Sequence, residues 1–552
     1  EEARTITIED SGVGMTRDEI VRDLGTIAHS GAAAFLRQLQ TEKRPTVEMI
    51  GQFGVGFYSV FMAAEEVRVV SRSYRPDAEA VAWVSDGGSE YKVSAAEKES
   101  RGTRIEIKLK EDAADFANAW RLEQIIKKHS DFVAFPIYVG DKEEAINRQA
   151  ALWRQPAQEI DEEQYNDFYR HLTLDFEEPL AHIHMVTDAP VHLRSILYIP
   201  STRERGMLNP RTDNGLKLYV HNVLIQEYNT DLLPKYFRFV EGVVESEDLP
   251  LNISREAIQA SPAARRISRA LTRKLIGELE TTATEQPEVY AQFWHEFGPF
   301  VKEGVASEPT AQADLMPLLR FHSSRSGEGM VSLAEYVGRM AEDQEAIYYV
   351  LGEDLKSVAR SPHLDYFKDH DLEVLYLVDP IDSFVAMALQ EYEEKPLKNI
   401  DDASLELPDR EAPEEETPPA VEEADFNRLV SRFVKVLGDR VVEVRASRVL
   451  KTSPCRLVSP DDTPARGMSR VYRLLDQEFE IPKRILEINR GHPIMVNLAH
   501  LVTHSPESEV VDPTIELLFE NQLLMEGLHP NPTEMIPNIQ KLMETATGQV
   551  EA

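Results

Sequence analysis

The sequence holds a single cysteine, Cys455, in 552 residues. One thiol cannot form an internal disulfide, so the chain is no disulfide scaffold and suits a reducing compartment. No run approaches the ~18 continuous apolar residues of a membrane span, and no secretory signal is visible at the start. We therefore expect a cytoplasmic protein. Nothing near Cys455 would activate its thiol, and we expect it to be inert.

Basic residues are scarce relative to acidic ones. The 60 lysines and arginines face 96 aspartates and glutamates, which gives a formal net charge of −36. Nucleic acids and anionic membrane surfaces select positively charged patches, so this balance argues against both as partners. Residues 411–425 hold seven acids, three prolines and no base, a composition typical of a solvated linker.

Several catalytic motifs are missing as well. The sequence has no Gly-x-x-x-x-Gly-Lys-Ser/Thr loop and no His-Glu-x-x-His pair. His182 and His184 share one face of an expected strand, but no third ligand is evident. We therefore expect no metal site built from them.

Length and pattern predict a multidomain α/β (α+β) protein. The chain is long enough for roughly three or four domains of ~150 residues. We expect a first domain at 1–137, a middle domain at 150–395, an acidic linker at 396–425 and a last domain at 426–552.

Alternation and capping signals predict the main elements. Strands are expected over Arg4–Glu9, Val67–Ser73, Ala80–Val84, Tyr91–Val93, Thr103–Leu109 and Leu216–Ile225. Helices are expected after Thr16 in a capping box with Glu19, over 32–40, over Gln124–Phe135, from Pro262 to about Leu279, from Phe426 to Leu437, from Asp512, and around Met535–Met543.

Three glycine-containing motifs follow one another along the chain, and their order is more informative than any one of them. Asp10-Ser-Gly-Val-Gly-Met15 follows the first strand, Gly51-Gln-Phe-Gly-Val-Gly-Phe57 precedes an apolar run of helical length, and Gly102-Thr103 enters a later strand. A carboxylate at Asp10 can accept a hydrogen bond from the adenine amine, and a glycine-rich loop can bind phosphate through its backbone N–H groups. Taken singly, each motif fits an ordinary turn equally well, and Thr103 fits an ordinary strand residue.

In this order the motifs resemble the nucleotide-binding domain of gyrase-type topoisomerases, mismatch-repair ATPases, sensor histidine kinases and heat-shock protein 90 chaperones. Three stretches look specifically like the chaperone family: Leu24-Gly-Thr-Ile-Ala28 with Ser30-Gly31, Ile50-Gly-Gln-Phe-Gly-Val-Gly-Phe-Tyr-Ser59, and Leu249-Pro-Leu-Asn-Ile-Ser-Arg-Glu256. The resemblance extends over the whole chain. The lack of a long charged insert after Pro136, and the ending Gln549-Val-Glu-Ala552, are similar to bacterial members.

The resemblance implies a Bergerat-type (GHKL) ATP-binding α/β sandwich, a mixed α/β middle domain with a client-binding surface and an α+β dimerisation domain, with ATP/ADP and Mg²⁺ as cofactors. It also implies roles for individual residues. Asp10 would bind adenine, with the base pocket lined by Gly12, Gly14 and Met15 and the base supported by Thr103. The phosphates would be contacted by Gly51, Gly54, Gly56 and Phe57, and His29 and Ser30 would also face the nucleotide. Arg255 would reach the γ-phosphate, with Asn252 and Gln259 beside it. His29 and Ala32 depart from the lysine and threonine usual in the family, which puts those two contacts in doubt.

The family's general-base glutamate and magnesium-ligand asparagine lie some forty or more residues before the position of Asp10. Only nine residues precede Asp10 in this sequence. We therefore expect that the chain lacks its true N-terminal segment and has no metal ligand of its own in this site. We also expect it to bind nucleotide poorly and to hydrolyse no ATP above background until upstream residues are restored.

The resemblance implies a dimeric chaperone that binds partly folded client proteins. ATP would close the clamp, the C-terminal helices would hold two chains together, and other chaperones are candidate partners. Two alternatives remain open: a nucleotide-independent holdase or scaffold, and a DNA-processing ATPase of the same superfamily. The net charge and the Leu249–Glu256 motif disfavour the second.

Overall fold

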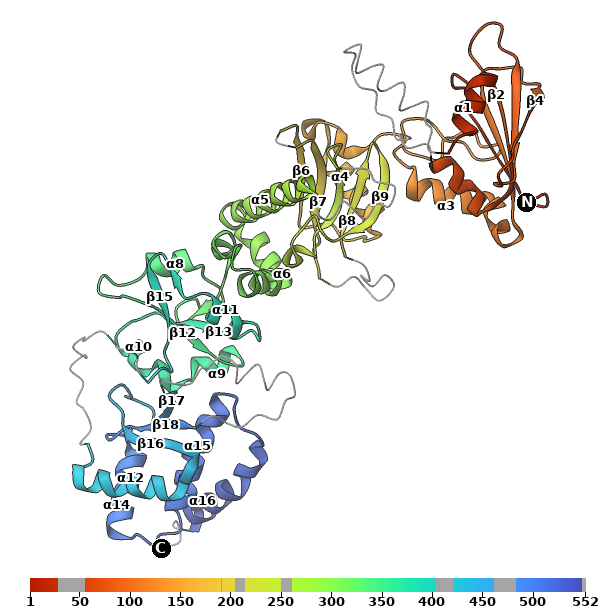
Figure 1. Cartoon of the computed structure of the whole chain (residues 1–552). Helices are drawn as coiled ribbons and strands as arrows, with labels where there is room; N and C mark the ends of the chain where they lie inside the picture. The colour runs from red at the N-terminus through yellow and green to blue at the C-terminus, as the bar shows by residue number, and fades with distance from the viewer. Residues whose placement is uncertain are drawn as a thin grey trace. The chain divides into compact units, whose positions relative to one another are not determined.

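The computed structural model describes residues 1–27, 55–189, 191–203, 214–249, 261–403, 405, 407, 420–460 and 483–548 (Figure 1). The chain divides into two compact units, Glu1–Leu275 and Ile276–Ala552. Both units mix helices with sheets, which confirms the multidomain α/β prediction. The division falls inside the expected middle domain, and the expected domain bounds stay predictions.

The first sheet is antiparallel throughout, with the strand order β1-β5-β2-β3-β4. Its strands are β1 (Thr5–Glu9), β2 (Ala64–Arg72), β3 (Ala80–Ser85), β4 (Lys92–Ala96) and β5 (Gly102–Leu109). The helices of this segment are α1 (Arg17–Leu24), the 3₁₀ helices η1 (Gly56–Met62) and η2 (Glu111–Ala117), and α3 (Ala119–His129). Because β1 pairs with β5 along its length, the residues that follow β1 lie beside those that begin β5.

Local signals placed α1 correctly. The Thr16 side chain accepts from the Glu19 backbone N–H, and the Glu19 carboxylate accepts from the Thr16 N–H, so the predicted capping box is confirmed. Ile20 of α1 is fully buried against Val67, Trp83 and other residues of the sheet. The helix is therefore fixed both at its first turn and by its apolar face.

Two stretches of this segment differ from the expectation. The apolar run after Gly56 forms the 3₁₀ helix η1 rather than an α-helix. The helix expected over Gln124–Phe135 is α3, which begins earlier because the Asn118 side chain caps it by accepting from the Arg121 N–H. The helix expected over 32–40 lies outside the described residues.

The second sheet has the order β6-β7-β10-β8-β9, with β8 and β10 parallel. Its strands are β6 (Ala181–Thr187), β7 (Leu193–Ile199), β8 (Leu216–Val220), β9 (Val223–Asn229) and β10 (Glu241–Glu245), with α4 (Glu162–Thr173) contacting β10 and α5 (Pro262–Glu285) following the sheet in sequence. The single strand expected over Leu216–Ile225 was wrong. The chain turns at His221 and Asn222, whose φ angles of 49° and 63° are those of a tight hairpin turn.

The second unit carries a five-stranded sheet and a three-stranded sheet, ordered β11-β13-β12-β15-β14 and β16-β18-β17. The strands are β11 (His322–Ser323), β12 (Ile347–Leu351), β13 (Leu375–Leu377), β14 (Glu391–Tyr392), β15 (Lys395–Asn399), β16 (Val441–Ala446), β17 (Cys455–Val458) and β18 (Arg484–Ile488). The helices are α6 (Pro287–Ser307), α7 (Gln312–Leu315), α8 (Leu333–Gly338), α9 (Leu355–Ala359), α10 (Asp365–Asp369), α11 (Asp382–Ala388), α12 (Glu423–Leu437), α14 (Pro493–His504), α15 (Val511–Met525) and α16 (Ile536–Gly548).

The three-stranded sheet packs against α12, α14 and α15. Buried Leu429, Phe433, Leu498, Ile515 and other residues of these helices form one core with the strands. The predicted end of α12 is confirmed, since Gly438 follows the helix with a φ of 58°. Periodic apolar patterns therefore predicted α12, α15 and α16, whereas α14 was not predicted.

Candidate functional site

Asp10 sits where β1 ends and is tied to the start of β5. Its backbone N–H donates to the Thr103 carbonyl oxygen at 2.9 Å. Its carboxylate Oδ1 accepts from the Gly12 N–H at 2.8 Å and from the Thr103 N–H at 3.2 Å. Among the described residues, Oδ2 has no hydrogen-bond partner, and the residue is exposed. The site thus presents an oriented carboxylate with one oxygen available to a ligand.

Two glycines make this close approach of backbone possible. Gly14 has a φ of 61°, and a Cβ added there would lie 1.9 Å from the Arg72 carbonyl oxygen. Gly102 has a φ of 112°, and its Cβ would lie 2.0 Å from the Asp10 carbonyl oxygen. Any side chain at either position would push the β1–α1 turn away from β2 and β5.

Ser71 of β2 connects the predicted residues and was missed by the sequence analysis. Its side chain is fully buried. The hydroxyl oxygen accepts from the Met15 N–H at 2.8 Å and shares a hydrogen bond of 2.9 Å with the Thr103 hydroxyl. Because Ser71 pairs with Thr103 across the β2–β5 ladder, the sheet itself sets this contact. Little in the sequence pointed to it, because β2 also carries Glu65, Glu66, Arg68 and Arg72, so one more polar residue does not stand out.

Replacing Ser71 with alanine should loosen this network. The change leaves the Met15 N–H and the Thr103 hydroxyl without their partner, and a buried unsatisfied group costs about 1–3 kcal/mol. We expect hydrogen exchange of β2 and β5 amides to speed up by about five- to 150-fold where exchange reports opening of this sheet. Ser94→Ala, at an exposed position of β4, is the matched control. Equal exchange rates in both variants would contradict a structural role for Ser71.

The loop preceding β2 is described only from Val55 onward. Nothing described lies within 4 Å of a Cβ added at Gly56, so the backbone there is open. The Phe57 ring instead packs edge-on against Trp83, with ring centroids 5.8 Å apart. A phosphate contact at Phe57 would therefore use its backbone N–H rather than its side chain.

The remaining predicted site residues lie outside the described residues. They are His29, Ser30, Gly51 and Gly54 in the first unit, and Asn252, Arg255 and Gln259 further along it. Asp10, Gly12, Gly14, Met15 and Thr103 do come together around Ser71. Of this cluster, the exposed Asp10 carboxylate is the group that could accept a hydrogen bond from an amine such as that of adenine.

Other candidate groups are accounted for by packing. His184 contacts the Tyr165 hydroxyl at 2.8 Å and the Trp153 carbonyl oxygen at 3.3 Å, and burial lowers its pKa. Cys455 is fully buried, and burial raises its pKa to about 12, as expected for an inert thiol. Within the described ranges, no three His, Cys, Asp or Glu side chains gather into a group that could hold a metal ion.

In the described parts of the chain, no helix is both long enough and apolar enough to cross a membrane.

Comparison with known proteins gives consistent matches. The model of the family "Hsp90 protein" matches residues 139–552. The chain is 40% identical over 549 residues to the "Chaperone protein HtpG" of Desulfitobacterium hafniense (strain Y51), covering 99% of this chain and 88% of that protein. It is 42% identical over 561 residues to the protein of the same name from Chlorobaculum tepidum, with 99% and 88% covered. The Myxococcus xanthus protein of that name is 40% identical over 540 residues, with 95% and 82% covered.

Proposed function

The chain belongs to the Hsp90 family, and on this premise we propose that it is an ATP-dependent chaperone that remodels partly folded client proteins as a homodimer in the cytoplasm. The observation that carries the nucleotide part of this proposal is the Asp10 carboxylate. It is held by two backbone N–H groups, and its second oxygen has no partner among the described residues.

In the proposed mechanism, Asp10 accepts a hydrogen bond from the exocyclic amine of adenine. Thr103 and Ser71 position the turn that carries this carboxylate, and Gly14 lets that turn pack against the Arg72 carbonyl oxygen of β2. Gly12, beside the Asp10 carboxylate, would line the base pocket. Bound ATP supplies the phosphoanhydride whose hydrolysis drives the cycle. The glycine loop would donate backbone N–H groups to phosphate oxygens, and Arg255 would stabilise charge on the γ-phosphate. No group of three or more His, Cys, Asp or Glu side chains in the described ranges could hold a metal ion, so we assign none of them to Mg²⁺.

The competing proposal is a nucleotide-independent holdase. A holdase would suppress client aggregation equally with and without ATP, whereas the proposed chaperone should recover client activity only with ATP. The test is refolding of a denatured client enzyme by the full-length protein, compared with the Asp10→Asn variant, which is expected not to bind ATP. ATP-independent recovery, equal in both proteins, would favour the holdase. A DNA-processing role is not carried further, because the chain belongs to the Hsp90 family.

The homodimer is proposed to form through the last two helices. Leu524 of α15 is 45% exposed, and Ile536 and Met543 of α16 are 47% and 62% exposed. The two α16 residues are seven apart and so share a helix face. Pairing with the same face of a second chain would bury these three apolar side chains.

Deleting residues from Asp512 onward would not test this dimer. The deletion also removes Ile515, Phe519 and Leu523 of α15, which fill the core of the chain's own C-terminal segment. Three charges placed on the exposed face are a more selective change. We expect Leu524→Glu, Ile536→Glu and Met543→Glu together to convert dimer to monomer at micromolar concentration, because the pairing would bury six like charges. Sedimentation velocity measures the result.

The matched control places a negative charge on α16 away from the proposed face. Lys541 is exposed and lies five residues after Ile536, which turns it about 140° away around the helix, so Lys541→Glu should leave the dimer intact. A triple variant that keeps its helicity and stays dimeric would mean that these helices cover only their own core.

A further inference from the structure

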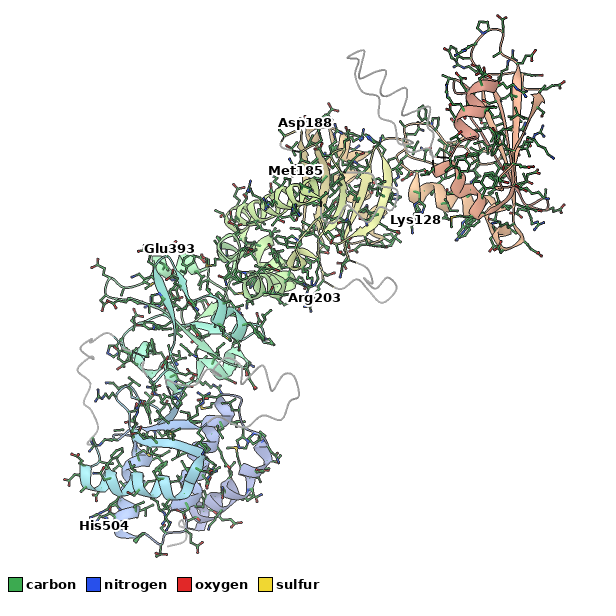
Figure 2. All side chains as sticks on the ribbon, viewed as in Figure 1. Lys128, Met185, Asp188, Arg203, Glu393 and His504 are labelled. Carbon is green, nitrogen blue, oxygen red and sulfur yellow. The ribbon has the colours of Figure 1, made fainter. Side chains whose placement is uncertain are left out.

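Two histidines stand one helical turn apart on the outer face of α14. The helix buries Met495, Leu498 and Ala499 against its neighbours. His500 and His504 lie on the opposite face and are exposed, and His504 is at the outer edge of its unit (Figure 2). Their rings are stacked, with centroids 4.3 Å apart and an angle of 23° between the planes.

The hydrogen bonds of His500 and His504 leave ring nitrogens with a lone pair free to bind a ligand. His504 Nδ1 lies 3.1 Å from the His500 carbonyl oxygen and, as a donor to it, carries the ring proton. In that tautomer Nε2 of His504 keeps its lone pair. No hydrogen bond or ion pair involves the His500 ring within the described residues. His504 is also the last residue of α14, where the helix dipole favours a positive charge.

We propose that His500 and His504 form a chelate for a late first-row divalent cation: Cu²⁺, Ni²⁺ or Zn²⁺. Imidazole nitrogen is a preferred ligand of these ions. Two histidines at positions i and i+4 of a helix are the spacing with which zinc proteases bind their metal on one helix face. Small rotations of the two exposed rings bring both Nε2 atoms toward one ion, and water fills the remaining positions.

The surroundings set the strength and selectivity of this site. No described third His, Cys, Asp or Glu joins the pair as a metal group. The nearby Thr503 hydroxyl donates to Asp425, which also pairs with Arg428, so that carboxylate is engaged elsewhere. Two protein ligands bind more weakly than the four of a structural zinc site. The site should therefore be exchangeable, with Cu²⁺ bound more tightly than Ni²⁺ or Zn²⁺.

The test uses Cu²⁺ alone with the whole chain. Calorimetric titration and electron paramagnetic resonance should reveal a site with nitrogen splitting from two histidines. His500→Asn or His504→Asn should each weaken that site by at least about tenfold, since one bidentate ligand becomes a single ligand. The double variant should bind Cu²⁺ more weakly than either single one, because it also loses the single imidazole ligand that each of those keeps.

The control is His295→Asn on α6, a histidine whose side chain is 83% exposed and lies near Glu296, with no second histidine three or four residues away. Cu²⁺ titration of that variant should reproduce the unaltered chain at the proposed site. Circular dichroism without metal checks that all variants keep their helices. The proposal is overturned if both His500 and His504 variants bind Cu²⁺ as the unaltered chain does, or if only one of the two matters.

Discussion

Replacing Asp10 with asparagine should abolish ATP binding by the full-length protein. Oδ1 accepts two backbone N–H groups, from Gly12 and Thr103, so the amide oxygen of asparagine is expected to take that place. The amide N–H₂ would then meet the adenine amine, donor against donor. A site built around one hydrogen bond loses the bond and leaves a polar group unpaired, so we expect binding at least ~10²-fold weaker.

Calorimetric titration with ATP measures this effect in a chain extended by the expected upstream segment. Asp18→Asn is the matched control, since Asp18 is an exposed residue of α1 that we assign no role. Hydrogen exchange of β1 and β5 verifies that the asparagine variant keeps its fold. Unchanged affinity in Asp10→Asn would remove the carboxylate from the nucleotide site.

Replacing Arg255 with alanine should slow ATP hydrolysis by at least tenfold and leave ATP affinity nearly intact. Arg255 lies outside the described residues, and its role rests on the Leu249–Glu256 motif. A guanidinium that stabilises charge in the transition state contributes ~10³–10⁵ in rate in other phosphoryl-transfer enzymes. Phosphate release and ATP binding, measured on the same protein, separate the chemical step from binding.

Two further variants sharpen the Arg255 experiment. Arg255→Lys keeps the charge but loses the planar fork, so it should recover only part of the rate. Arg266→Ala, at an exposed position of α5, should hydrolyse ATP at the unaltered rate. Full turnover by Arg255→Ala would exclude this arginine from the reaction. The two variants should therefore differ: Asp10→Asn should lose both ATP binding and hydrolysis, whereas Arg255→Ala should lose hydrolysis alone.

Elements with local signals were predictable from the sequence. The Thr16 capping box, the Ser261–Pro262 start of α5 and the Gly438 stop of α12 each depend on residues within one turn. The hairpin between β8 and β9 was missed because alternation continues through both strands, and only the positive φ angles at His221 and Asn222 reveal the turn. Patterns of period two cannot tell one long strand from two short ones.

The candidate site shows the same limit. Motif order identified Asp10, Gly12, Gly14, Met15 and Thr103, which the structure brings together. Ser71 was not identified, because its role comes from a contact with Thr103, 32 residues away in the sequence. Such a contact exists only once β2 and β5 have paired. Sequence reasoning therefore named residues that the fold brings together but missed the buried serine that joins them, and their contact with a ligand stays a prediction.

The glycines of this site differ in whether a substitution would first affect folding or first affect activity. A mutation of Gly14 or Gly102 meets backbone at 1.9 Å or 2.0 Å, so it is eliminated by misfolding before any ligand is involved. At Gly56 an added Cβ meets nothing described within 4 Å, so a variant can fold and be judged on its activity. If glycine never varies at positions 14 and 102 among related sequences, steric crowding of the backbone is enough to explain it. At Gly56, where an added Cβ has space, the residues that are tolerated would instead reflect the requirements of ligand binding.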